Sequence, residues 1–254
     1  GLPPFEEQQS IARYLDRETA KIDLLISKQE RLIELLDEKR KSVISETVVK
    51  GANTNVKTKD SGVPWIGKVP QHWALKKIRY VCEVNPHAAA WSGAPDVDAE
   101  FFPMEAIGEK GQLDRSRFKP YAEALKGYTP FSNGDVVVAK VTPCFENGKG
   151  ARISELRNSV AFGTTELTVI RPRRILDSEY LYFITVSESV RQLGAAEMFG
   201  AGGLKRVPDE FFENLVIPIP PLSEQKDIVK ELIARVGQIE RLLAKAERAV
   251  SLLR

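Results

Sequence analysis

Cysteine and histidine are scarce in this sequence, and their scarcity excludes several kinds of site. The 254 residues include two cysteines and two histidines. Cys82 and Cys144 lie far apart and neither belongs to a Cys-x-x-Cys pair, so the sequence provides no disulfide framework and no cysteine-rich metal site. His72 and His87 are separated in the sequence and form neither a metal-ligand cluster nor a convincing catalytic triad. We therefore expect neither a metal ion nor another cofactor.

Long apolar runs are absent as well. No stretch approaches the roughly 18 apolar residues of a membrane-spanning helix, and the N-terminus carries no signal-peptide pattern. We therefore expect a cytoplasmic protein. The chain begins with Gly1, immediately before a motif that returns near its end. This beginning leads us to expect a fragment or a processed product, with further sequence upstream.

Neither sign of charge dominates the composition. Lys and Arg total 37, Asp and Glu total 35, and the formal net charge is +2. Any nucleic-acid-binding surface must therefore come from local clusters of cations, because the net charge neither supports nor excludes one. The hydrophobic share of 43% and the charged share of 28% are typical of a globular protein slightly rich in charge. The length corresponds to one or two domains.

The sequence does contain an internal repeat. The motif Pro-Pro-x-x-Glu-Gln occurs at residues 3–8 and again at residues 220–225, an offset of 217 (220 minus 3). Proline is excluded from helix interiors, so each motif is expected just before a helix begins. The same offset pairs identical residues further along, namely Ile11 with Ile228, Leu15 with Leu232, Ile22 with Ile239, Leu25 with Leu242, Lys28 with Lys245, Glu30 with Glu247, Arg31 with Arg248, Leu35 with Leu252 and Leu36 with Leu253. We therefore predict one helical element twice, as a first arm (residues 1–51) and a second arm (residues 219–254).

The first arm carries the pattern of a long helix with a coiled-coil stripe. Neither glycine nor proline interrupts it before Gly51, which is a plausible helix stop. A helix over residues 6–49 would measure about 60–65 Å at about 1.5 Å per residue. Its apolar residues recur at spacings that fit one heptad seam: Ile11, Leu15, Ile22, Leu25, Leu32, Leu36 and Val43.

A stripe of this length requires a partner, and the second arm offers one. The second arm has matching apolar residues at Ile228, Leu232, Ile239, Leu242 and Leu253, with the smaller Ala249 among them. We expect the two arms to pair with each other, and self-association is the alternative. The intervening residues 52–218 leave from the end of one arm and return at the start of the other. The arms are therefore expected to run antiparallel, as a stalk that carries a globular domain.

Residues 52–218 have the pattern of a mixed domain, and the fold class predicted for the chain is α+β. β-Branched runs predict strands, and a period near 3.6 predicts helices. The expected elements are a linker at 52–62, an irregular proline-containing segment at 63–73, strands at 75–81, 136–141, 164–170 and 216–217, a helix at 178–193 with Ser178 as its N-cap, and a short helix at 208–215.

Three loops of this domain combine glycines with cations, amides and hydroxyl groups. They lie at residues 140–152, 163–166 and 199–206. Such side chains, together with backbone N–H groups, bind phosphates and base edges, although the same composition is also that of ordinary exposed loops. The candidate DNA-contacting residues are Lys140, Thr142, Asn147, Lys149, Arg152, Thr164, Thr165, Lys205 and Arg206.

No catalytic motif is complete in this sequence. Residues 85–88, Asn-Pro-His-Ala, lack the second proline and the aromatic residue of the Asn-Pro-Pro-aromatic motif of amino-group DNA methyltransferases. Residues 148–150, Gly-Lys-Gly, lack the spacing of a phosphate-binding loop. The glycines at residues 200–203 do not have the dinucleotide-binding spacing. We therefore expect a protein without catalytic activity of its own.

Four stretches together resemble the specificity subunits of type I restriction-modification systems. They are the repeated Pro-Pro-x-x-Glu-Gln motif, residues 60–73, residues 134–150 and residues 215–220. The resemblance covers essentially the whole chain, and the repeat is its most specific part. It implies a conserved helix (residues 1–51), one target-recognition domain (residues 52–218) and a second conserved helix (residues 219–254). That order corresponds to the C-terminal half of a family subunit, because the first recognition domain of the family pattern is missing.

The resemblance also implies a function and a set of partners. The recognition domain would bind one half of a split double-stranded DNA target, and the stalk would set the distance between the half-sites. The stalk would also bind the modification subunits, which use S-adenosylmethionine to methylate adenine, and the ATP-dependent restriction subunit would join them. Two other hypotheses remain open. One is a coiled-coil adaptor whose globular domain binds another protein, and the other is a single-chain methyltransferase or nuclease.

Overall fold

The structure is a computed structural model, and it describes residues 2–53, 55–87, 97–201 and 203–254. Two residues of the motifs considered above, Ala88 and Gly202, lie outside the described residues. The chain divides into two compact units. Unit 1 consists of Gly1–Val43 and Ile233–Arg254, and unit 2 consists of Ile44–Leu232. Helix α1 (Phe5–Lys50) and helix α7 (Leu222–Leu253) each contribute residues to both units.

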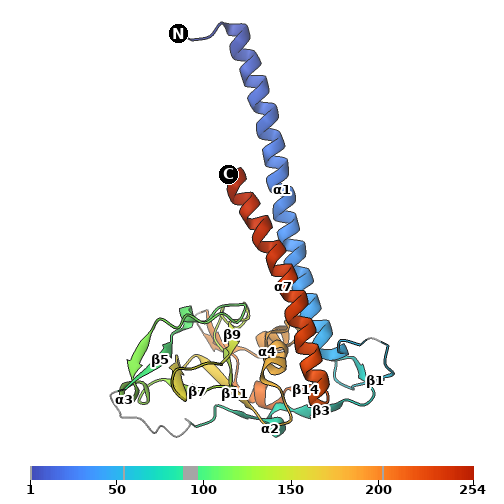
Figure 1. The fold of residues 1–254 in the computed structure, drawn as a ribbon, viewed down its shortest axis with the longest axis vertical. Coiled ribbons are helices and arrows are strands. Elements are labelled where there is room, and N and C mark those ends of the chain that lie inside the picture. The colour runs from blue at the N-terminus through green and yellow to red at the C-terminus, as the bar shows by residue number, and fades with distance from the viewer. Residues whose placement is uncertain (1, 54, 88–96, 202) are drawn as a thin grey trace. The chain divides into compact units, whose positions relative to one another are not determined.

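Unit 1 is a pair of antiparallel helices. Figure 1 shows α1 and α7 side by side, running in opposite directions. At the end of α7, Arg254 Nη2 donates a hydrogen bond of 2.7 Å to Glu30 Oε1 of α1. The buried side chains of α7 recur at gaps of 4, 3 and 4 residues, as in a heptad seam: Ile239, Leu243, Ala246 and Val250. The expected pairing of the two arms is therefore confirmed in this unit.

The expected register of the seam is partly wrong. Leu242 is 51% exposed, whereas its neighbour Leu243 is 4% exposed and occupies the seam. On α1, Leu25 and Leu32 are exposed, and the adjacent Ile26 and Ile33 are the half-buried residues. Apolar residues stand next to one another at each of these places, so a heptad pattern fits two neighbouring registers equally well. Packing against the partner helix selects between them.

The ends of α1 follow from its sequence. The helix begins at Phe5, directly after the proline pair, and ends at Lys50. Gly51 has a φ of +79°, a left-handed conformation that other residues adopt at a steric cost, so the predicted stop is confirmed. At this end, in unit 2, the buried Tyr180 hydroxyl donates a 2.8 Å hydrogen bond to the Val48 carbonyl oxygen. Burial raises the pKa of Tyr180, which therefore stays a donor.

Unit 2 holds the strands and the short helices. Its sheets have the strand orders β6-β5-β10-β7 and β4-β11-β8-β9, accompanied by the pairs β1-β2, β12-β13 and β14-β3. The element bounds are β1 Thr58–Asp60, β2 Lys68–Pro70, β3 Ala74–Lys77, α2 Ile78–Val81, β4 Cys82–Val84, β5 Asp98–Phe102, η1 Met104–Ala106, β6 Phe118–Pro120, α3 Tyr121–Ala124, β7 Thr129–Ser132, β8 Val136–Ala139, β9 Gly150–Arg152, β10 Val160–Gly163, β11 Leu167–Pro172, α4 Ser178–Val186, α5 Glu188–Ala196, β12 Phe199–Ala201, β13 Leu204–Arg206, α6 Asp209–Asn214 and β14 Val216–Ile219.

One apolar core joins the two four-stranded sheets. Strand β8 follows Gly134, whose φ of +90° forms the turn, and its run of valines is fully buried. It pairs antiparallel with the buried strand β11. Side chains from both sheets meet in one cluster, which includes Phe102 and Phe131 from the first sheet and Val137 and Val169 from the second. The mixed α+β prediction is therefore confirmed.

Several predicted elements differ from the structure. Strand β3 ends at Lys77, and helix α2 replaces the rest of the strand expected at residues 75–81. The expected linker contains β1, and the expected irregular segment contains β2, because these two short strands pair with each other. The helix expected at residues 178–193 is two helices separated at Ser187, whose backbone is extended. Its N-cap is Asp177, which accepts hydrogen bonds from Glu179 N and Tyr180 N, and the prediction of Ser178 is wrong.

The described residues contain neither a candidate membrane-spanning helix nor a candidate metal-binding cluster. None of the helices in this part of the chain is both long enough and apolar enough to cross a membrane. Within residues 2–53, 55–87, 97–201 and 203–254, no three His, Cys, Asp or Glu side chains gather in a group that could hold a metal ion. Burial raises the pKa of the Cys82 thiol to about 12, so this cysteine stays protonated at neutral pH.

Candidate nucleic-acid interface

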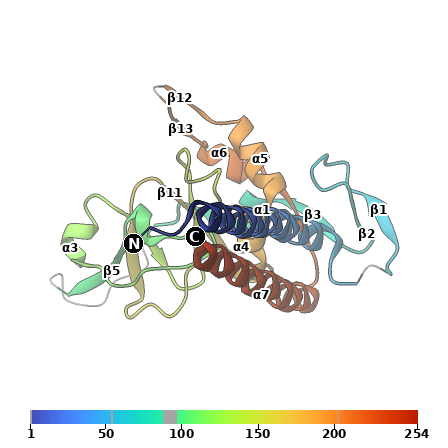
Figure 2. The ribbon, with the colours of Figure 1, turned by 90° about the horizontal axis from the view of Figure 1, so that it is seen from above.

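A two-stranded ribbon, β12 with β13, carries the last of the predicted loops. Figure 2 shows it projecting beyond α5 and α6. The Thr142 hydroxyl donates a 3.0 Å hydrogen bond to the Gly203 carbonyl and accepts one of 3.0 Å from Lys205 N. Phe199 is 64% exposed, and the Lys205 side chain is exposed as well. The predicted Thr142 therefore fixes the ribbon, whereas Lys205 presents a charge to solvent.

The ribbon is also held by an ion pair at its base. The Arg206 guanidinium donates hydrogen bonds to both carboxylate oxygens of Glu166, the Nε–Oε2 distance being 2.8 Å. This pairing holds the pKa of Glu166 below its usual value and raises the pKa of Arg206. Lys140 Nζ lies 3.6 Å from Asp209 Oδ1. Lys140 and Arg206 therefore have carboxylate partners within the protein, which offset part of their charge.

Two cations of the loop at residues 140–152 also have internal partners. Lys149 Nζ donates a 3.2 Å hydrogen bond to the Met104 carbonyl. Arg152 donates to the Ser178 hydroxyl at 2.9 Å and lies 3.3 Å from Glu179. Arg152 also pairs with Val136 in the sheet, at the opposite end of β8 from Lys140. The structure therefore separates Arg152 from the cluster around the ribbon.

The remaining predicted residues lie near turns. Thr164 Oγ1 accepts a 3.0 Å hydrogen bond from Glu166 N, which closes the turn before β11. Thr165, the central residue of that turn, is exposed. Asn147 is exposed too, in the turn between β8 and β9. Of the nine predicted residues, Asn147, Thr165 and Lys205 are thus the exposed ones.

An open cleft of about 410 Å³ brings predicted and unpredicted residues together. Its walls include the predicted Lys140 and Thr165, and also Asn85, Lys126 and Tyr128. Asn85 has a φ of +49°, and its side-chain oxygen accepts a 3.0 Å hydrogen bond from Val169 N, which holds it at the edge of β11. A cation, an amide and an aromatic ring in one cleft are groups that bind phosphates and bases.

Three of these cleft residues, Asn85, Lys126 and Tyr128, are not among the DNA-contacting residues predicted from the sequence. Lys126 and Tyr128 flank Gly127, so a cation, a glycine and an aromatic residue stand together in the sequence. This combination is the signal that could have identified them. Asn85 gave a weaker signal, because its neighbours fit only an incomplete methyltransferase motif.

Comparison with known proteins identifies relatives of this chain. Residues 70–244 match the family described as "Type I restriction modification DNA specificity domain". The specificity subunit of the type I restriction enzyme EcoAI of Escherichia coli is 38% identical over 181 residues, which cover 68% of this chain and 30% of that protein. The EcoEI specificity subunit of the same species is 37% identical over 165 residues, or 64% of this chain and 27% of that protein. The chain thus spans less than a third of either relative.

Solved structures show the same fold. The first comes from a study described as the structural basis of complex assembly and conformational transition of the type I R-M system, and it matches with a TM-score of 0.71 and 18% identity. The HsdS subunit from Thermoanaerobacter tengcongensis matches with a TM-score of 0.56 and 18% identity. Both matches cover 99% of this chain, and they cover 57% and 56% of the respective structures. Because the family match spans more than half of its residues, the chain belongs to the family of type I restriction modification DNA specificity domains.

Proposed function

We propose that this chain provides sequence recognition to a type I restriction-modification enzyme. In this proposal residues 52–218 form a target-recognition domain that binds one half of a bipartite double-stranded DNA target. The observation that carries the proposal is the family match over residues 70–244. That match includes both the ribbon and all the residues that line the cleft described above.

The proposed DNA-contacting face consists of the ribbon and the cleft. Lys205 and Lys126 are placed to bind phosphates, because a lysine on a flexible stem provides a point charge without needing a fixed geometry. A two-stranded ribbon is narrow enough for the major groove. Thr165 and Asn147 add exposed polar groups. The other predicted residues, Lys140, Thr142, Lys149, Arg152, Thr164 and Arg206, mainly hold the loops in place through the contacts described above.

The two arms, residues 1–51 and 219–254, have a separate proposed role. They would separate the recognition domains of an assembled subunit and bind the modification and restriction subunits. The chain itself would be non-catalytic, so methyl transfer with S-adenosylmethionine and ATP-dependent DNA translocation would belong to those partners. The long exposed face of α1 provides a surface for such assembly.

Replacing both proposed phosphate ligands tests the DNA-contacting face. In Lys126→Ala/Lys205→Ala, we expect DNA affinity to fall about ten-fold at moderate salt, because two charge contacts are lost. The slope of log K against log salt should decrease by roughly 2, one for each contact. The measurement is fluorescence anisotropy with a labelled duplex, in the presence of modification subunits. Lys68→Ala, which removes an exposed lysine of β2, is the matched control. Equal affinities and slopes for the three proteins would contradict the proposed face.

A further inference from the structure

Asn85 pairs with Val169 through both its backbone and its side chain. Asn85 N donates a 2.7 Å hydrogen bond to the Val169 carbonyl, and Asn85 Oδ1 accepts one of 3.0 Å from Val169 N. Val169 lies in β11 and is fully buried, so its N–H needs this acceptor. The carboxamide of Asn85 therefore has one orientation, with its oxygen toward β11 and its Nδ2 group turned away from Val169 N.

The Nδ2 group is the part of this side chain that remains for a ligand. Asn85 is exposed and lines the cleft, and its Nδ2 has no hydrogen-bond partner within residues 2–53, 55–87, 97–201 and 203–254. An amide nitrogen carries two N–H donors and no acceptor. Asparagine ordinarily reads adenine with both ends of its carboxamide. Because the oxygen of Asn85 faces β11, this residue presents a donor to the cleft.

The rest of the cleft is also poor in acceptors. The lining residues that the structure describes include Lys126, Lys140 and Thr165 but neither aspartate nor glutamate. The carboxylate of Glu166, which follows Thr165 in the sequence, binds Arg206 instead. The amino group of a base that entered this cleft would therefore lose its hydrogen bonds to water without replacement by a carboxylate.

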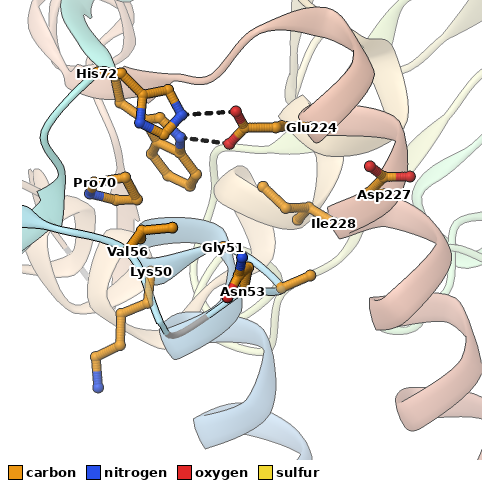
Figure 3. Close-up of a pocket in the computed structure, with 11 residues that line it drawn as sticks. Lys50, Gly51, Asn53, Val56, Pro70, His72, Glu224, Asp227 and Ile228 are labelled. Atoms are coloured by element: carbon orange, nitrogen blue, oxygen red, sulfur yellow. Dashed lines mark hydrogen bonds and ion pairs between the residues drawn. The ribbon is translucent and has the colours of Figure 1, made fainter.

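A second hollow in unit 2 has the opposite character. This pocket of about 290 Å³ is lined by Glu224 and Asp227, among other residues, and Figure 3 shows both on one helix. Glu224 Oε2 accepts a 2.9 Å hydrogen bond from Trp73 Nε1, and Glu224 Oε1 lies 2.6 Å from His72 Nε2. Carboxylates repel the phosphates of DNA, so the cleft, and not this pocket, is the hollow suited to a base.

The position of the cleft favours the major groove. Lys140 lines the cleft, and its carbonyl accepts a 2.8 Å hydrogen bond from Val207 N, directly after β13. The cleft therefore adjoins the ribbon, whose width fits the major groove. In that groove guanine O6 and thymine O4 are keto oxygens that accept hydrogen bonds, whereas cytosine and adenine present amino groups.

We propose that Asn85 is a specificity-determining residue whose Nδ2 group donates a hydrogen bond to the keto oxygen of guanine or thymine in the major groove. This inference rests on the proposed function, because it assigns a class of base to one residue of the proposed DNA-contacting face. A fixed donor in a cleft without carboxylates favours the two keto bases over the two amino bases.

Asn85→Asp reverses the polarity of this side chain with little change in its shape. One carboxylate oxygen still accepts from Val169 N, and aspartate tolerates the φ of +49° at this position. The other oxygen takes the place of Nδ2 and accepts a hydrogen bond where Nδ2 donates one. The base preference should therefore change from guanine or thymine to cytosine or adenine, whose amino groups donate.

Selection from a randomised duplex library measures this preference. Each protein is assembled with the modification subunits and incubated with duplexes randomised across the target, and the bound duplexes are sequenced. At one position of a half-site, the wild-type chain should enrich guanine or thymine. Asn85→Asp should lower that enrichment about ten-fold or more. The other positions should keep their preferences.

Two further variants separate the lost donor from the added charge. Asn133→Asp adds the same charge outside the cleft, at an exposed asparagine whose Oδ1 accepts a 3.0 Å hydrogen bond from Leu156 N. It should leave every base preference unchanged. Asn85→Gly removes the donor without adding charge, and glycine adopts a positive φ freely. It should lose the preference at the same position and gain no new one, and it decides the outcome if Asn85→Asp binds no duplex.

Two results would overturn the inference. One is a wild-type preference that both Asn85 variants retain at every position. The other is that the position affected by these variants carries cytosine or adenine in the wild-type selection, because Asn85 would then not bind a keto oxygen. A wild-type chain without any sequence preference would contradict the proposed function as well, whereas preferences that survive in the variants contradict this inference alone.

Discussion

Replacing Arg171 with alanine is expected to lower the free energy of unfolding by about 3 kcal/mol. Arg171 donates hydrogen bonds of 2.7 Å to both carboxylate oxygens of Asp135, which is 1% exposed. These hydrogen bonds raise the pKa of Arg171, so the guanidinium stays charged. Its removal leaves a buried carboxylate that still accepts the 2.7 Å hydrogen bond from Ser132 N but has lost the guanidinium that balances its charge. The pair joins β11 to the turn before β8, so the loss should affect the whole of unit 2.

Chemical denaturation measures this effect, and two further variants control for its cause. Asp135→Asn/Arg171→Ala is expected to recover part of the lost stability, because asparagine keeps an acceptor for Ser132 N and carries no charge. Arg174→Ala removes an exposed arginine nearby and should change stability by less than about 0.5 kcal/mol. A loss below about 1 kcal/mol for Arg171→Ala, or a double variant less stable than the single one, would contradict the assigned role of the ion pair.

Shortening both helices by one heptad is expected to change the spacing between DNA half-sites and leave their sequences unchanged. The deletion removes residues 33–39 of α1 and residues 245–251 of α7. These two segments lie opposite each other when the antiparallel pairing of Glu30 with Arg254 is continued along the helices. Seven residues span about 10 Å of helix. That length corresponds to about 3 base pairs of B-DNA, so the spacer should shorten by about that number. Sequencing of methylated sites with the assembled modification enzyme is the measurement.

The deletion must remove a whole heptad from each helix. Removing seven residues keeps the seam positions in phase, so the helices can still pair. Removing two residues from each helix instead turns the apolar stripe beyond the deletion to nearly the opposite face of the helix, and is expected to abolish methylation through loss of pairing. An unchanged spacer after the seven-residue deletion would show that the helices do not set the distance between half-sites.

The helices could be predicted closely from the sequence because their signals are local. Proline before Phe5 and a glycine after Lys50 define the ends of α1, and the repeat identifies its partner. The register could not be predicted, because apolar residues occupy adjacent positions such as Leu25 and Ile26. Only contact with α7 decides which of the two is buried.

The roles of individual cations could not be predicted, because they depend on contacts between distant residues. Arg206 pairs with Glu166, 40 residues away in sequence, and Lys140 lies beside Asp209. No local sequence pattern indicates such pairs. Composition alone therefore could not distinguish the cations that have internal carboxylate partners from those that are free to bind DNA. Lys126 was missed for the related reason that the fold, and not the sequence, brings it to the cleft with Thr165.

The most direct test of the central claim exchanges the proposed recognition domain. Residues 52–218 would be replaced by the corresponding segment of the EcoAI relative, which is 38% identical over the matched residues. The sequences methylated in cells carrying the intact system would then be determined. We predict that one half of a two-part methylated sequence changes to that of the donor, whereas the other half stays the same. A methylated sequence that is unchanged after the exchange would contradict the claim that residues 52–218 recognise the DNA sequence.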